Sequence, residues 1–165
     1  MADIKTGDKA PSFQLPGFVP GKGETTIDLK DYAGSPVVLY FYPKDDTSGC
    51  TTEACEFRDN ARAFNTLGAT VIGVSKDSVA SHEKFAKKYD LNFPLVSDAD
   101  GTLCAAYDVW VEKSMYGRKY MGIERSTYLI DANGEIAAFW RNVKVKGHVT
   151  AVAEALDALS KKIAA

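Results

Sequence analysis

The feature that most constrains the fold is an uninterrupted apolar stretch, PVVLYFY, at residues 36–42. β-Branched and aromatic residues favour a strand, and a run without polar alternation is typical of a strand buried on both faces. Pro43 ends the run, because proline has no N–H for a continuing ladder. We therefore expect a layered α/β fold with this strand near its centre.

The rest of the chain alternates between strand and helix patterns. Further strands are predicted at 69–75, 93–96, 126–130 and 135–140, and helices over 47–64, 79–89, 102–107 and 149–163. The sequence DANG at 131–134 predicts a hairpin between the last two strands. Residues 7–28 are expected to be loose, with a short hairpin around 21–23, and 108–124 to be irregular. This order predicts a mostly parallel sheet closed by an antiparallel hairpin.

Length and charge exclude several classes of protein. The 165 residues predict a single domain, 1–165, and a net charge of −2 without a basic patch argues against nucleic acid or an anionic membrane as partner. The polar start lacks a signal sequence, and no stretch reaches the roughly 20 apolar residues of a membrane span. We expect a cytoplasmic protein, whose three cysteines, Cys50, Cys55 and Cys104, do not form a permanent disulfide framework.

Cys50 stands where chemistry is expected in such a fold. It follows the central strand and a polar loop, and it lies in the first turn of the next predicted helix. Free N–H groups and the positive end of the helix dipole stabilise an anion there, and the thiolate is the nucleophilic form of cysteine. Gly49 allows the backbone to approach a ligand, and the Thr47 hydroxyl can orient a small polar substrate. We predict that Cys50 attacks a small electrophile.

Cys55 follows five residues later on the same predicted helix. Helix geometry separates the two α-carbons by roughly 8–9 Å, whereas a disulfide requires about 4.4–6.8 Å. If Cys50 and Cys55 react with each other, the first turns of the helix must therefore unwind. The alternative for Cys55 is an ordinary core position on that helix.

The order of these residues resembles a known enzyme family. The pattern Pro43-x-x-x-Thr47-x-x-Cys50 matches the active site of peroxiredoxins, and CTTEAC at 50–55 resembles their Q-type group, the bacterioferritin comigratory proteins. Residues 77–85, 93–98 and 124–131 also resemble that group, so the similarity covers nearly the whole chain. It implies a thioredoxin-like fold, with a central mixed sheet flanked by helices, and thiol peroxidase activity without a metal or organic cofactor.

The resemblance also implies a reaction sequence. Cys50 would attack hydrogen peroxide or an organic hydroperoxide and become a sulfenic acid. Cys55 matches the resolving cysteine, which would form an intramolecular disulfide with Cys50, and thioredoxin or glutaredoxin would reduce that bond by thiol exchange. The group's members suggest a monomer that serves antioxidant defence.

Further roles follow from the same resemblance. Thr47 would hydrogen-bond the thiolate and the peroxide, Pro43 would shield the site from water, and Gly49 would help to bind the substrate. Arg125 would hold the thiolate and polarise the O–O bond, because its guanidinium stays charged and donates in a fixed fork. Ser48 departs from the proline that is frequent in the group, and we expect a more mobile loop because serine does not fix φ.

Other interpretations need weighing. A thioredoxin-type oxidoreductase is disfavoured, because that class uses Cys-x-x-Cys whereas this chain has Cys-x4-Cys. A redox-sensing binding protein, which changes partners when the helix unfolds on oxidation, stays open. Cys104 is expected to be a packed core thiol, and no histidine has zinc-ligand spacing to a cysteine. The aromatic side chains of 108–124 are consistent either with a collar near the site or with ordinary packing.

Overall fold

A computed structural model describes residues 4–164, with side chains up to residue 162. Its main sheet has seven strands in the order β2-β1-β5-β4-β3-β8-β9. These strands are β1 (Gln14–Val19), β2 (Gly23–Asp28), β3 (Val37–Phe41), β4 (Thr70–Ser75), β5 (Leu95–Ser97), β8 (Ser126–Ile130) and β9 (Ile136–Trp140). The helices are α1 (Ser48–Asp59), α2 (Ala61–Thr66), α3 (Val79–Lys88), α4 (Thr102–Ala106) and α5 (His148–Ala164), with a 3-10 turn, η1, at Leu29–Tyr32.

The sheet is mixed rather than mostly parallel. β3 pairs in parallel with β4, and β4 with β5, whereas β1, β2, β8 and β9 join through antiparallel ladders. The prediction of a mostly parallel sheet was wrong, because β8 returns beside β3 in the opposite direction and the N-terminal hairpin adds to β5. The predicted hairpin around 21–23 is confirmed, and it is longer than expected. The central mixed sheet flanked by helices is also confirmed.

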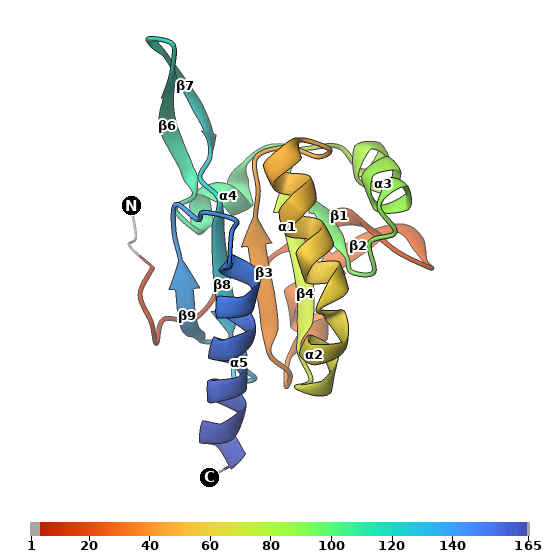
Figure 1. The fold of residues 1–165 in the computed structure, drawn as a ribbon, viewed down its shortest axis with the longest axis vertical. Coiled ribbons are helices and arrows are strands. Elements are labelled where there is room, and N and C mark those ends of the chain that lie inside the picture. The colour runs from red at the N-terminus through yellow and green to blue at the C-terminus, as the bar shows by residue number, and fades with distance from the viewer. Residues whose placement is uncertain (1–3, 165) are drawn as a thin grey trace.

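Both faces of β3 are buried, as the apolar run predicts. Val38, Tyr40 and Tyr42 belong to the core that lies under α1, α2, α3 and α5, and α1, α2 and α5 stand in front of the sheet in Figure 1. Val37 and Leu39 face the opposite core, which is closed by α4 and the segment around Tyr107. The two cores hold β3 in place, and the chain that leaves its carboxyl end leads directly to α1.

The helix predicted over 47–64 is two helices. α1 ends at Asp59, and Asn60 has φ −99° and ψ 8°. The Asn60 side chain donates to the carbonyl oxygen of Glu56 at 2.7 Å, a local bond that competes with helix continuation. Phe57 and Phe64 still share one core, with ring centroids 5.8 Å apart. The predicted core positions were therefore correct, but the prediction of one continuous helix was wrong.

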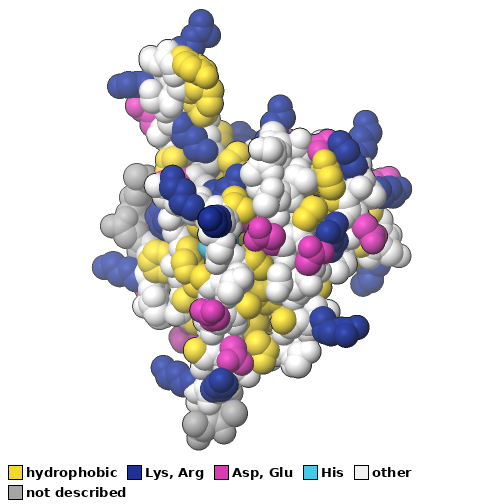
Figure 2. Space-filling view, in the orientation of Figure 1, with side chains coloured by type: hydrophobic (Ala, Val, Ile, Leu, Met, Phe, Trp, Pro, Cys, Tyr) yellow, Lys and Arg dark blue, Asp and Glu magenta, His cyan; other side chains and the backbone are white. Residues whose placement is uncertain are grey.

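Residues 108–124 are not irregular. They form a hairpin of β6 (Trp110–Met115) and β7 (Arg118–Ile123), which projects from the body of the protein (Figure 1). Tyr116 and Gly117 have φ of 52° and 79°, as two-residue hairpin turns require. The distal part of the hairpin carries an exposed apolar surface beside basic side chains (Figure 2). Tyr116 belongs to this apolar surface and is 98% exposed. Ordinary packing therefore does not explain Tyr116.

The C-terminal amphipathic helix is confirmed by α5, whose Val149, Val152 and Leu156 are buried. The side chain of Ile163, which completes the predicted apolar stripe, lies outside the described residues, as does the start of the chain at 1–3. Within residues 4–164, no helix is long and apolar enough to cross a membrane.

Candidate active site

Cys50 is the third residue of α1, just beyond the carboxyl end of β3. The first intrahelical bond runs from the N–H of Thr51 to the carbonyl of Thr47, at 2.8 Å. The Cys50 N–H therefore belongs to the first turn, whose donors are free to face an anion. The residue is only 2% exposed and lies among core side chains. This placement agrees with the predicted thiol at a helix start.

Arg125 brings a positive charge to the sulfur. Its Nη2 lies 3.4 Å from Cys50 Sγ, and its Nη1 donates to Glu53 Oε1 at 2.6 Å. The guanidinium thus bridges a thiol and a carboxylate, and it comes from the residue just before β8, 75 positions along the chain from Cys50. The antiparallel pairing of Phe41 with Ser126 aligns the start of β8 with the end of β3. This register delivers the arginine to the thiol.

Glu53 is a site residue that the sequence analysis missed. Its side chain is fully buried, and burial raises its pKa to about 7, although the Arg125 charge acts in the opposite direction. Its Oε2 has no hydrogen-bond partner among the described residues, and neither has the nearby hydroxyl of Tyr40. The available signal was the spacing, because a glutamate three residues after Cys50 lies on the same helix face.

The loop before α1 places the remaining predicted residues. The Thr47 hydroxyl is exposed and donates to the carbonyl of Lys44 at 2.8 Å, and it makes no capping bond to the helix. The Thr47 backbone holds the N-cap position of α1. Pro43 lies on the exposed surface of the same loop. Ser48 is the first residue of α1.

Gly49 has a structural use that the sequence analysis did not predict. A Cβ on Gly49 would lie 3.1 Å from Arg125 Nη2. The missing side chain therefore leaves room for the guanidinium to reach Cys50. In this geometry the glycine admits a protein group, whereas the sequence suggested only that it admits a ligand.

Cys55 lies on the same uninterrupted helix as Cys50 and is half-buried. All three cysteines are free thiols. An intact α1 holds the α-carbons of Cys50 and Cys55 roughly 8–9 Å apart by helix geometry. The structure therefore corresponds to the reduced, fully folded form.

Two further basic groups experience the charge of Arg125. Burial, followed by the Arg125 charge, lowers the pKa of Lys113 in β6 below its ordinary value. Burial, followed by Arg125, lowers the pKa of His148 to about 4, and the His148 Nε2 lies 2.7 Å from the Thr127 hydroxyl. His148 is therefore neutral at physiological pH. Arg125 is the cation in direct contact with the Cys50 sulfur.

The other candidate groups have structural explanations. Cys104 is fully buried, and burial together with Asp98 raises the pKa of its thiol far above the ordinary range. Asp98 accepts from the backbone N–H groups of Leu103 and Cys104, so it stabilises the start of α4. Across residues 4–164, no group of three His, Cys, Asp or Glu side chains is arranged to hold a metal ion.

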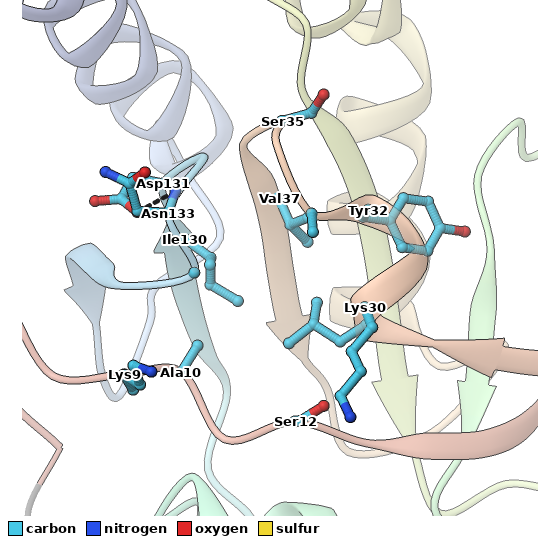
Figure 3. A pocket seen from close by; sticks show the side chains of 13 residues that line it. Lys9, Ala10, Ser12, Lys30, Tyr32, Ser35, Val37, Ile130, Asp131 and Asn133 are labelled. Atoms are coloured by element: carbon cyan, nitrogen blue, oxygen red, sulfur yellow. Dashed lines mark hydrogen bonds between the residues drawn. The ribbon is translucent and has the colours of Figure 1, made fainter.

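A cavity of about 220 Å³ lies at the opposite end of β3 from Cys50 (Figure 3). Val37 and Ile130 form part of its apolar wall, and Lys9, Lys30 and Ser12 line its polar side. Its lining includes no cysteine and no arginine. A hollow beside the start of α1 is nearer to the thiol, and it is lined in part by Ser48, Gly49 and Lys146.

A thiol in the first turn of a helix, with a guanidinium at its sulfur, is the setting typical of a reactive cysteine in a redox enzyme. The AhpC/TSA family matches residues 6–139, and the chain belongs to this family. It is 52% identical over 149 residues to a putative peroxiredoxin bcp of Coxiella burnetii, covering 90% of this chain and 96% of that protein. It is 50% identical over 159 residues to peroxiredoxin Bcp of Bacillus subtilis, covering 96% and 99%.

Solved structures give the same result for the fold. A cysteine-to-serine variant of Xylella fastidiosa PrxQ superposes with a TM-score of 0.87 at 44% identity, covering 97% of this chain and 99% of that one. A Xanthomonas campestris bacterioferritin comigratory protein, described for its alkyl peroxide reduction activity, gives 0.85 at 46% identity, covering 94% and 99%. The fold is therefore the thioredoxin-like fold of peroxiredoxins. The enzyme is a thiol peroxidase, which takes a peroxide as substrate and a thiol as reductant.

Proposed function

We propose that Cys50 is the peroxidatic cysteine, acting on hydrogen peroxide and organic hydroperoxides. The observation that supports this assignment is the 3.4 Å contact between Arg125 Nη2 and Cys50 Sγ. The thiolate attacks the terminal peroxide oxygen, the O–O bond breaks, and the departing oxygen takes a proton to leave as water or an alcohol. Cys50 becomes a sulfenic acid, and the sulfur has been oxidised by two electrons. Arg125 stabilises the charge that develops on the separating oxygens.

Thr47 and Pro43 complete the site from the loop side in this proposal. The Thr47 hydroxyl gives its proton to Lys44, so its oxygen is free to accept the O–H of the peroxide. That contact turns the terminal oxygen toward Cys50. Pro43 covers the loop on the solvent side and limits the access of water, and Gly49 keeps the approach open.

Cys55 is proposed as the resolving cysteine. Its thiol attacks the sulfur of the Cys50 sulfenic acid, an S–S bond forms, and the hydroxyl group leaves as water. The first turns of α1 must unwind for this step, because helix geometry keeps the α-carbons roughly 8–9 Å apart and a disulfide needs about 4.4–6.8 Å. Thioredoxin or glutaredoxin then reduces the bond by thiol–disulfide exchange.

We further propose that the chain acts as one domain, 1–165, as a monomer in the cytoplasm. It needs no metal or organic cofactor, because the sulfur of Cys50 carries out the redox step. The proposal includes no nucleic acid and no membrane among its partners, in keeping with the net charge of −2.

Peroxide-dependent NADPH oxidation through thioredoxin and thioredoxin reductase tests the assignment. Cys50→Ser should abolish turnover, and Cys55→Ser should oxidise Cys50 once and then stop. Cys104→Ser is the matched control and should cycle like the wild type. Mass spectrometry after one equivalent of peroxide should show a 50–55 disulfide within one chain. Full activity of Cys50→Ser would contradict the assignment of Cys50 as the peroxidatic cysteine. Normal cycling of Cys55→Ser would contradict the assignment of Cys55 as the resolving cysteine.

The second candidate is a redox sensor whose partners change when α1 unwinds. The observation in its favour is that α1 contains both Cys50 and Cys55, and a disulfide between them would require its first turns to unwind. Turnover distinguishes the two functions, because a sensor is oxidised once whereas an enzyme consumes peroxide for as long as the reductant lasts.

A further inference from the structure

The loop between β3 and α1 is attached to the protein body by a buried carboxylate, that of Asp45. Its Oδ1 accepts from the Tyr42 hydroxyl at 2.5 Å. Its Oδ2 accepts from the Ser81 hydroxyl at 2.8 Å and lies 2.7 Å from His82 Nδ1. The Asp45 N–H donates to Asp77 Oδ2 at 2.8 Å. Asp45 is 7% exposed and His82 is not exposed at all.

Both ring nitrogens of His82 have hydrogen-bond partners. Nδ1 faces the carboxylate of Asp45, and Nε2 lies 2.9 Å from the carbonyl oxygen of Val96. A carbonyl oxygen only accepts, so Nε2 must donate. Nδ1 is hydrogen-bonded to Asp45 Oδ2, so both ring nitrogens are engaged. Asp45 and His82 therefore form a buried pair whose side-chain polar atoms all have partners.

This buried pair lies outside the segment that unwinds in the proposed disulfide step. Unwinding between Cys50 and Cys55 removes helical bonds of α1, but the groups that hold Asp45 come from the end of β3, from the segment after β4 and from α3. Thr47 is only two residues from Asp45. Asp46 is also held, by Lys88 Nζ at 2.8 Å and the Tyr89 hydroxyl at 2.7 Å. That second attachment is exposed, and exposed ion pairs contribute little.

We propose that Asp45 and His82 are positioning residues, which hold the loop before α1 in place while the first turns of the helix unwind and re-form. The buried pair stops the unwinding at the loop, so Thr47 keeps its position through the catalytic cycle. After reduction, α1 re-forms from a fixed N-cap and Cys50 returns to Arg125. This inference rests on the proposed disulfide between Cys50 and Cys55.

Rapid mixing of the reduced full-length protein with hydrogen peroxide tests the proposal. Tryptophan fluorescence separates a peroxide-dependent phase, oxidation of Cys50, from a peroxide-independent phase, formation of the disulfide. In Asp45→Asn and His82→Gln the first rate should fall at least tenfold, because Thr47 loses its fixed position. The second rate should rise, because unwinding is no longer restrained. A purely structural role would lower the unfolding midpoint without shifting the two rates in opposite directions.

The controls keep the inference separate from the proposed function. Asp46→Asn removes the exposed attachment next to the buried one and should leave both rates within twofold of wild type. Ser81→Ala removes one donor to Asp45 and keeps the Asp45–His82 contact, so it should show the same pattern more weakly even if the other variants fail to fold. A wild type without the second phase would overturn the proposed disulfide instead.

NMR of the wild type gives an independent measurement. The Nε2–H proton of His82, hydrogen-bonded to the Val96 carbonyl oxygen, should be observed and protected from solvent exchange, and rapid exchange of that proton would overturn the buried pair. Rates within twofold of wild type in folded Asp45→Asn and His82→Gln would overturn the positioning role.

Discussion

Replacement of Arg125 should slow the attack on peroxide far more than it destabilises the fold. A guanidinium nitrogen 3.4 Å from the sulfur interacts with a thiolate by about 5 kcal/mol at an effective dielectric constant of 20. Part of this interaction is already present before the reaction begins, so only the part gained in the transition state affects the rate. Loss of one such donor typically costs about 100–1,000-fold in rate. We expect that loss for Arg125→Met, and a smaller one for Arg125→Lys.

The lysine variant distinguishes charge from geometry. Lysine retains the charge, but a single ammonium group does not reproduce the fork that reaches Glu53 and Cys50 together. The assay is the second-order rate of Cys50 oxidation by hydrogen peroxide, followed by fluorescence in stopped flow. Arg141→Lys is the matched control, because Arg141 pairs with Glu124 at 3.1 Å, outside the Cys50 contact. An Arg125→Met rate within threefold of wild type would refute the electrostatic reasoning.

Four further outcomes are expected. Gly49→Ala should slow Cys50 oxidation about tenfold while raising the unfolding midpoint, because a Cβ 3.1 Å from the guanidinium displaces it and alanine favours helix by about 1 kcal/mol; an unchanged rate would contradict this. The pKa of His148 is about 4 in the folded protein and 6.5 ordinarily. Neutral His148 therefore contributes its full share to the stability of the fold above pH 6.5, and this contribution is lost as pH falls toward 4. Between pH 6.5 and 4, the free energy of unfolding measured by urea titration should fall by up to about 3 kcal/mol less in His148→Gln than in the wild type. Equal losses in the two proteins would contradict this prediction. Phe64→Ala should lower the free energy of unfolding, measured in urea, by about 3–5 kcal/mol. A loss below 1 kcal/mol would contradict this, because it would mean that neighbouring side chains fill the cavity left by the ring. Native Cys104 should not react with a thiol reagent within the time that labels Cys55.

The sequence predicted the elements whose burial is uniform. β3 and β4 are buried along nearly their whole length, and α5 has one clear apolar face, so their patterns follow directly from packing. The β6–β7 hairpin could not be found in this way, because most of its residues face solvent and its turn uses tyrosine at a left-handed position. The sheet direction also escaped prediction, since strand order is set by contacts between residues far apart in sequence.

The site was predicted unevenly for a similar reason. Cys50 was identified from its local setting, a helix start after a buried strand. Arg125 was identified only by resemblance, because its contact with the thiol depends on the register between β3 and β8. Glu53 and His82 were missed as members of buried networks, since burial of a charged residue cannot be read from its immediate neighbours. For Thr47, the sequence did not predict the local contact, in which its exposed hydroxyl donates to the carbonyl oxygen of Lys44 in the same loop.

The interruption at Asn60 divides the front layer into two units of different stability. An isolated helix of 12 residues is marginal in water, so α1 can open as a separate cooperative unit. α2 starts afresh at Ala61 and stays packed on β4, where Phe64 is 1% exposed. Amide exchange in α1 should therefore proceed through a low-energy opening, while exchange in α2 requires unfolding of the whole protein. In the proposed disulfide step, Asn60 would therefore limit the loss of structure to α1.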